Sequence, residues 1–293
     1  METAGREWAA RKIKNAQGIS NCYSIEDDYD LLSPNAQALA REHRWLDPEE
    51  PFNFAKAYSG RLVAQPLGLQ RFRRLNKLLA RQSVHSFETL KAILRDHYED
   101  ELIAPRFGAT AGTFMSVCMH MRDWGESETS ASLLTRCDPI LGIVGRYAPV
   151  QPCLSAYIPV YMTDSLPQKM EAGEKEYSDA SLWWQVKKLS LLVTVDEKAA
   201  SSIRQKLAEL EAEFSTMADQ AEKKAAALII QGQNAAAKKC LSEVTEICTQ
   251  RLYDYARSEG NILAERIRTK GGLYGRQKEA IEKYCAYASI PLL

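Results

Sequence analysis

The chain has 293 residues, with 38 Lys and Arg side chains against 38 Asp and Glu, so its formal net charge is zero. Hydrophobic residues make up 45% and charged residues 26% of the sequence, a composition typical of folded proteins rather than disordered ones. Without a basic excess we expect no nucleic-acid partner. Without an apolar run of about 18 residues or a signal-like start, we expect no membrane span and a cytoplasmic location.

Cysteine and histidine usage predicts neither disulfides nor a metal site. The seven cysteines are an odd number without close-spaced pairs, which fits a reducing compartment. The four histidines, His43, His85, His97 and His120, do not stand at the spacing typical of metal ligands. We therefore expect no metal and no cofactor.

The N-terminal part of the chain predicts short strands followed by a helix. Residues 6–25 mix apolar and polar side chains around the turn-forming run 15–18, which indicates two short strands. Ser33 and Pro34 supply an N-cap and a proline at the first helical position, so a helix is predicted over 34–43.

Two amphipathic helices and then a set of strands follow. Apolar residues recur on one helical face over 68–80 and again over 86–98. After these helices, short apolar runs broken by Gly and Pro favour an antiparallel sheet, and therefore an α+β fold. The strands are expected at 113–119, 130–135, 140–146 and 154–162.

From residue 179 onward the sequence predicts helices alone. A seven-residue repeat of apolar side chains is interrupted at 231–234, after which a second apolar stripe begins. The simplest interpretation is a helical hairpin that packs on the rest of the chain beside Trp183 and Trp184, and the alternative is a free coiled-coil dimer. The residues of the first stripe are Ile203, Leu207, Leu210, Phe214, Met217 and Ala221.

Few residues indicate chemistry by themselves. Asn21 lies between apolar residues, where its amide could donate to an oxyanion or satisfy backbone groups in a turn. Cys118 and His120 stand two apart on an expected strand, so they would face the same side, as a nucleophile pair or as part of a core layer. A basic run on the helix at 68–80 could bind a carboxylate or form a solvated face. Its members are Arg71, Arg73, Arg74 and Lys77.

Several short motifs follow one another in a recognisable order. They are Glu-Thr-Ala-Gly-Arg-Glu-Trp-Ala-Ala at 2–10, Gly-Ile-Ser-Asn at 18–21, Phe-Asn-Phe-Ala at 52–55, Val-Cys-Met-His at 117–120, Thr-Ser-Ala-Ser at 129–132, Pro-Cys-Leu-Ser-Ala-Tyr-Ile-Pro at 152–159 and Leu-Trp-Trp at 182–184. In this order they resemble the secernin and cysteine-type dipeptidase family of N-terminal-nucleophile hydrolases, over roughly the whole chain. An unrelated α+β protein with chance matches is the alternative.

The resemblance implies a fold and a reaction. The expected fold is a partial αββα sandwich over 1–178, an incomplete hydrolase-like domain, followed by a helical C-terminal region over 179–293. In the family, a cysteine that begins the mature chain attacks an amide carbonyl, with its own α-amine as the base. Carried over, Asn21 is an oxyanion donor and Arg71 lies near the nucleophile, with Arg74 as the alternative to Arg71.

The same resemblance implies that the nucleophile segment is missing. Met1 falls inside what resembles a mid-domain hairpin, and Cys22 follows Asn21, so on a strand its side chain would point to the opposite face. We therefore expect a C-terminal portion of a dipeptidase or linear-amide hydrolase, inactive alone, that would take a peptide or small amide once completed. The alternative is a non-catalytic secernin-like scaffold. Open sheet edges or the helical tail would promote self-association.

Overall fold

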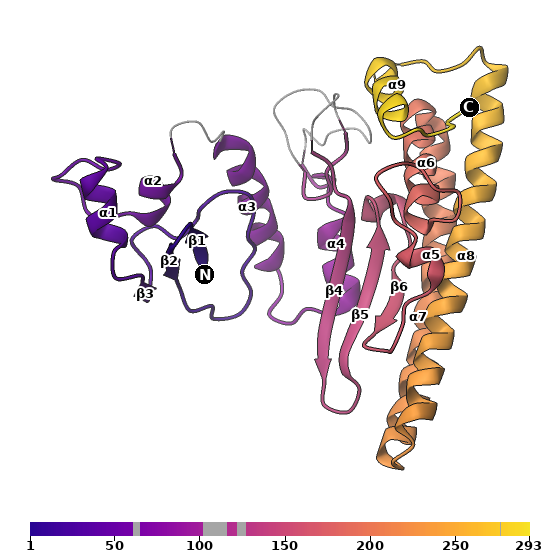
Figure 1. The fold of residues 1–293 in the computed structure, drawn as a ribbon, viewed down its shortest axis with the longest axis horizontal. Coiled ribbons are helices and arrows are strands. Elements are labelled where there is room, and N and C mark those ends of the chain that lie inside the picture. The colour runs from indigo at the N-terminus through magenta and orange to yellow at the C-terminus, as the bar shows by residue number, and fades with distance from the viewer. Residues whose placement is uncertain (61–64, 102–115, 122–126, 276) are drawn as a thin grey trace. The chain divides into compact units, whose positions relative to one another are not determined.

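The computed structural model describes residues 1–60, 65–101, 116–121, 127–275 and 277–293 (Figure 1). The chain divides into two compact units. The N-terminal unit comprises residues 1–86 and 111–117, and the C-terminal unit comprises residues 87–110 and 118–293. The expected domain boundary at residue 178 falls within the C-terminal unit.

The N-terminal unit begins with a small antiparallel sheet. Its strands are β1 (Glu2–Ala4), β2 (Glu7–Ala10) and β3 (Leu31–Leu32), in the order β1-β2-β3. Gly5 is the first of the two residues that join β1 to β2, and its φ of 63° suits the turns that close tight hairpins.

Of the two short strands predicted over 6–25, the first is present as β2, and the second, after the run 15–18, is absent. β2 pairs with the strand before it instead, and beyond residue 10 this segment contains only an isolated bridge between Ser20 and Cys22. Gly5 supplies the left-handed conformation that the tight turn needs, so the hairpin forms there.

The described part of the N-terminal unit also contains the helices α1 (Ala36–Glu42), α2 (Phe54–Tyr58) and α3 (Gln65–Leu79). The helices predicted over 34–43 and 68–80 are confirmed as α1 and α3, but the N-cap of α1 is Asn35 and not Ser33, whose hydroxyl bonds with Trp8 and Glu7 instead. At the start of α2, the side chain of Asn53 accepts a hydrogen bond from the backbone N–H of Lys56, which satisfies one of the free donors of the first turn. The buried core consists of Ala9, Ile25, Ala36, Ala40, Leu46, Phe52, Phe54 and Ala57.

The C-terminal unit contains a second antiparallel sheet and a helix that precedes it in the chain. The helix is α4 (Phe87–Leu94), and the sheet has the order β4-β5-β6. Three of the four predicted strands are thereby confirmed. They are β4 (Ala131–Asp138), β5 (Gly142–Pro149) and β6 (Ile158–Tyr161).

The side chains of this sheet alternate between a buried and an exposed face. Leu134 and Val144 are buried, whereas their neighbours Leu133 and Ile143 are 59% and 46% exposed. Arg146 on the buried face contacts Phe87 of α4 and pairs with Glu222 further along the chain. One face of the sheet therefore packs on helices, and apolar residues remain on the other.

The fourth predicted strand, 113–119, was wrong where it can be checked. Residues 113–115 lie outside the described residues, and residues 116–119 form a loop. Cys118 is nevertheless fully buried in this loop. The apolar run that indicated a strand instead reflects a loop that passes through the interior.

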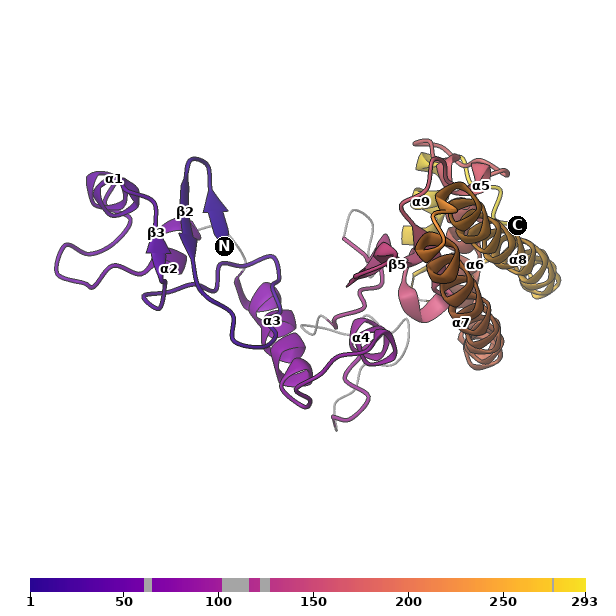
Figure 2. The same cartoon turned by 90° about the horizontal axis from the view of Figure 1, so that it is seen from below.

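The other elements described in the C-terminal unit are helices, and the longest two of them form an antiparallel hairpin that both views show (Figures 1 and 2). Gly232, with a φ of 76°, lies in the turn between them, as the interrupted heptad pattern predicts. The elements are η1 (Pro152–Leu154), α5 (Gln168–Glu171), α6 (Leu182–Val195), η2 (Glu197–Ala199), α7 (Ala200–Ile230), α8 (Asn234–Thr269) and α9 (Lys278–Tyr287).

The heptad stripe of α7 faces the interior of its own chain. Ile203, Leu207 and Phe214 are buried in the same core as Trp184 of α6 and Leu252 of α8. The predicted hairpin packed on the rest of the chain is therefore confirmed. Among the described residues, no helix is both long enough and apolar enough to cross a bilayer.

Candidate metal centre

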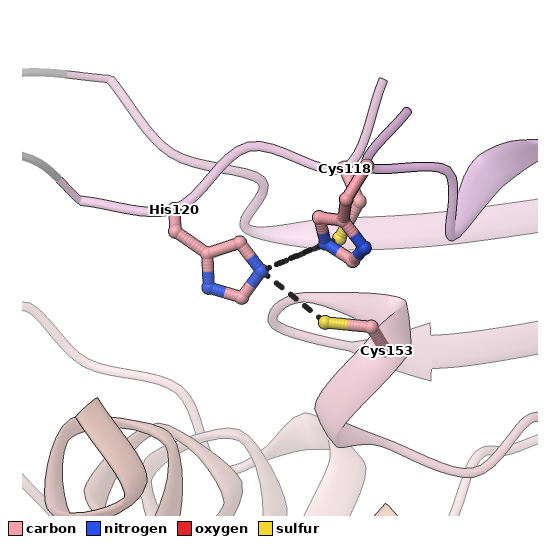
Figure 3. Close-up of side chains that lie close together, drawn as sticks. Cys118, His120 and Cys153 are labelled. Carbon is pink, nitrogen blue, oxygen red and sulfur yellow. Dashed lines mark hydrogen bonds between the residues drawn. The ribbon is translucent and has the colours of Figure 1, made fainter. Parts of the chain in front are cut away.

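Three segments of the C-terminal unit bring two cysteines and two histidines together. His97 follows α4, Cys118 and His120 belong to the loop after residue 115, and Cys153 lies in η1. One donor atom from each of the four lies within 4.8 Å of the other three. Figure 3 shows Cys118, His120 and Cys153 side by side, with the His120 ring directed at the Cys153 sulfur.

Hydrogen bonds to backbone carbonyl groups hold the three segments in place. The N–H of Cys118 donates to the carbonyl of Asp96 at 3.2 Å, which fixes the loop against the end of α4. Arg95 donates to the carbonyls of Pro152 and Ser155, at 2.8 and 3.2 Å, which fixes the end of α4 against η1. Tyr98 has a φ of 64°, so the chain turns away immediately after presenting His97.

The spacing of the donor atoms matches tetrahedral metal coordination. His120 Nε2 lies 3.1 Å from His97 Nε2, 3.2 Å from Cys153 Sγ and 3.8 Å from Cys118 Sγ. Zinc bonds of about 2.3 Å to sulfur and 2.0–2.1 Å to nitrogen, arranged tetrahedrally, place donor atoms about 3.3–3.8 Å apart. The three distances from His120 Nε2 therefore lie within a few tenths of an ångström of those around zinc, and a separation at the 4.8 Å limit of the cluster would have to shorten by about 1 Å.

An acidic side chain orients one of the histidines. His97 Nδ1 lies 3.0 Å from a carboxylate oxygen of Glu99, and the backbone N–H of His97 donates to the other oxygen at 2.8 Å. With Nδ1 directed at the carboxylate, Nε2 is left facing the cluster. This carboxylate–histidine arrangement is the usual second shell of a protein metal site.

The ionisation of the metal-free cluster prepares Cys153 for metal binding, whereas His97 and Cys118 hold protons that a metal would have to displace. Burial alone would raise the pKa of Cys153, but hydrogen bonds from Cys118 and both histidines hold it well below the ordinary value. Burial opposes protonation of His97, yet its contacts with Cys153 and Glu99 raise its pKa to about 9. Burial, together with the neighbouring Cys153, raises the pKa of Cys118. Cys153 is therefore the thiolate of the pair, and thiolate sulfur is the form that binds metal.

A buried ion-pair network supports the end of α4 beside the cluster. Glu211 of α7 accepts two hydrogen bonds from Arg95, at 2.6 and 3.1 Å, and one from the backbone N–H of Tyr157 at 2.8 Å. Lys91 lies 3.4 Å from the same carboxylate. Burial opposes ionisation of Glu211, but these partners keep its pKa below the ordinary value. The network thus fixes α4, the sheet and α7 around the site.

A cavity of about 250 Å³ adjoins the cluster. Cys153 and His97 form part of its wall, whereas Cys118 has no exposed surface. The remaining wall combines two arginines, a hydroxyl, a carboxylate and an apolar strip of α7. These residues are Arg95, Arg204, Ser155, Glu99, Leu207 and Ala208.

The site residues expected from the sequence lie in the N-terminal unit. Arg71 of α3 donates a hydrogen bond to the side-chain oxygen of Asn21, so the structure brings these two together. A Cβ at Gly68 would lie 2.9 Å from the backbone oxygen of Asn21, which explains how α3 approaches so closely. Burial and the negative charge of Glu2 raise the pKa of Cys22, which makes it a poor nucleophile.

Sequence reasoning missed two of the four cluster residues. Cys118 and His120 were considered as a pair, but His97 and Cys153 lie 21 residues before and 35 residues after Cys118, which no local pattern connects. The expectation of no metal site used spacing along the chain, whereas the fold provides the spacing in space. The Cys-x-His pair in 118–120 was the available signal.

A scan of the chain against models of known protein families finds no match. The secernin and dipeptidase resemblance therefore stays a prediction.

Proposed function

We propose that the C-terminal unit binds one zinc ion through His97, Cys118, His120 and Cys153. The observation that carries this proposal is the convergence of two imidazole nitrogens and two sulfurs within 4.8 Å. Two sulfur and two nitrogen donors at tetrahedral spacing are a combination that selects zinc over magnesium, calcium or manganese.

The role of this ion is structural. The protein supplies all four ligands, which leaves no coordination position for a substrate, as in closed zinc sites. The ion joins the end of α4, the loop after residue 115 and η1, which are distant in sequence. Because the unfolded chain does not hold these ligands together, the free energy of binding stabilises the fold.

Cobalt titration tests the proposal, because Co²⁺ takes the place of Zn²⁺ in tetrahedral sites and is coloured. We expect one equivalent to give the strong visible absorption of tetrahedral cobalt and a thiolate charge-transfer band, and one equivalent of zinc to abolish both. Cys153→Ser should remove the charge-transfer intensity of one thiolate and weaken binding at least 10-fold, whereas Cys137→Ser, at an exposed cysteine of β4, should change neither. A weak, pink octahedral spectrum would refute the site.

A second candidate function is amide-bond hydrolysis by a cysteine-type dipeptidase that includes the N-terminal unit. The contact between Arg71 and Asn21 favours it, because these are the two residues that the family resemblance assigns to the site. The exposed apolar residues Leu133 and Ile143 also suit a sheet covered by a second sheet, as in an αββα sandwich.

Co-expression tests this second candidate. We expect the chain alone to hydrolyse no dipeptide, and a cysteine-led N-terminal segment expressed with it to restore hydrolysis. Asn21→Ala should then reduce kcat by about 10²–10³-fold through loss of an oxyanion donor. Activity of the chain alone, or an inactive co-expressed complex, would count against it, and the inactive complex would favour the scaffold alternative.

A further inference from the structure

The two sulfurs of the proposed zinc site differ in access to solvent. Cys153 is partly exposed and lines the cavity of about 250 Å³, so a small solute in the cavity comes into contact with this residue. Cys118 is fully buried behind it. Both sulfur atoms belong to a cluster no wider than 4.8 Å. A reagent in the cavity can therefore approach Cys153, and the sulfur of Cys118 lies within 4.8 Å of the sulfur of Cys153.

We propose that Cys153 is a site of oxidation by peroxides and that Cys118 resolves the product into a disulfide, which expels the zinc ion. This inference rests on the proposed zinc site and adds a regulatory modification to it. The oxidant is hydrogen peroxide or a small hydroperoxide that enters the cavity.

The reaction has two steps. The Cys153 thiolate attacks the O–O bond of the peroxide, so an S–O bond forms, hydroxide leaves, sulfur loses two electrons and the peroxide is reduced. The sulfur of Cys118 then attacks the sulfenic sulfur and gives up its proton, so an S–S bond forms, the S–O bond breaks and a second hydroxide leaves. Protons from solvent convert the hydroxides to water. Zinc, left with only two imidazole ligands, is released.

The geometry permits the second step. The sulfurs start no more than 4.8 Å apart and need to reach about 2.05 Å, a movement that side-chain rotation and a small shift of the loop can supply. Arg95 and Arg204 line the same cavity, and their positive charges favour the departing hydroxide.

Two buried cysteines elsewhere on the chain, Cys248 and Cys285, are expected to react more slowly with peroxide than Cys153. Burial raises the pKa of Cys248 to about 12 and that of Cys285 to about 11, so both remain thiols at neutral pH, and thiols react slowly with peroxide. Cys137 is exposed on β4 and provides a reference for unassisted oxidation.

The test treats the zinc-loaded full chain with hydrogen peroxide and follows zinc release with a chromophoric chelator and disulfides by non-reducing peptide mapping. We expect release of the bound zinc together with a Cys118–Cys153 disulfide, and recovery of zinc binding after reduction by dithiothreitol. Cys137→Ser should behave as the unmodified chain. In Cys118→Ser, dimedone should trap a sulfenic acid at Cys153, since the resolving thiol is gone.

The outcomes separate this inference from the zinc proposal. A chain that binds no zinc before treatment overturns the zinc proposal and with it the release of metal. A chain that binds zinc but keeps it after peroxide, or is oxidised first at Cys137, overturns the inference and leaves the zinc site standing. A trapped sulfenic acid at Cys118 instead of Cys153 overturns the assigned order of attack.

Discussion

Glu99 determines which nitrogen of His97 faces the cluster. Its carboxylate lies 3.0 Å from Nδ1 of His97, and this contact is the main cause that lowers the pKa of Glu99 to about 2 against the effect of burial. An ionised carboxylate at this position holds the Nδ1–H tautomer and makes Nε2 the better ligand. The candidate site therefore depends on Glu99, although Glu99 is not one of the four proposed ligands.

Glu99→Gln should therefore weaken zinc binding without abolishing it. We expect a loss of about 10–100-fold in affinity, the usual effect of removing a second-shell carboxylate. Competition against a chelator of known affinity measures it, and Glu246→Gln, at an exposed position of α8, is the matched control. Equal affinities for Glu99→Gln and the control would show that the carboxylate has no part in the site.

From the sequence, candidate site residues could be singled out only by short spacing along the chain or by the family resemblance. Cys118 and His120 were singled out because they stand two apart, although the strand expected to align them is a loop. Asn21 and Arg71 were each assigned to the site by the family resemblance, and they are in contact. His97 and Cys153 could not be predicted, because their approach depends on how α4 and η1 pack, which a single sequence does not encode locally.

Helices α6 and α8 are joined at their C-terminal ends by one buried carboxylate. Asp196, the residue after α6, is 3% exposed and lies 2.9 Å from Arg266 and 3.1 Å from Lys270, at the end of α8. Burial would raise the pKa of Asp196, but Lys270 and Arg266 hold it below the ordinary value of 3.8. Cations near the last turn of a helix also interact favourably with its dipole.

This pairing predicts a pH-dependent contribution to stability. Because the folded-state pKa is depressed, the contribution is complete above the unfolded value and is lost as the pH falls through the folded value. Asp196→Asn should lower the free energy of unfolding by about 1–2 kcal/mol at pH 7, since both cations are half exposed. Denaturant unfolding across acidic pH, with a chelator present throughout, measures it, and Asp219→Asn is an exposed control. An equal loss at neutral and strongly acidic pH would contradict it.

Helices and strands with a strong periodic pattern of apolar residues were predicted well. The position of the first hairpin, which depends on a turn residue, and the buried loop at 116–119 were not. The helices α3, α7 and α8 and the strand β5 follow from helical periodicity, heptads and apolar runs, and α1 was placed correctly although its N-cap is Asn35 and not the predicted Ser33. The hairpin of β1 and β2 was misplaced, because Gly5 forms the turn rather than the polar run at 15–18. The loop at 116–119 was read as a strand, because an apolar run has the same pattern in a buried loop.

At the scale of the whole molecule, the zinc site would add a fourfold connection between parts of the C-terminal unit that hydrogen bonds already hold together. It joins the end of α4, the loop after residue 115 and η1, while Glu211 of α7 holds Arg95 between them. The overall charge balance and composition gave no indication of it. Residues 97, 118, 120 and 153 are distant in sequence, and only the fold brings their donor atoms within 4.8 Å of one another.

X-ray absorption at the zinc edge of the zinc-loaded, 293-residue chain is the most direct test of the zinc site. We expect one zinc per chain with two sulfur neighbours at about 2.3 Å and two nitrogen neighbours at about 2.0–2.1 Å. A first shell of oxygen and nitrogen alone, without sulfur, would contradict it.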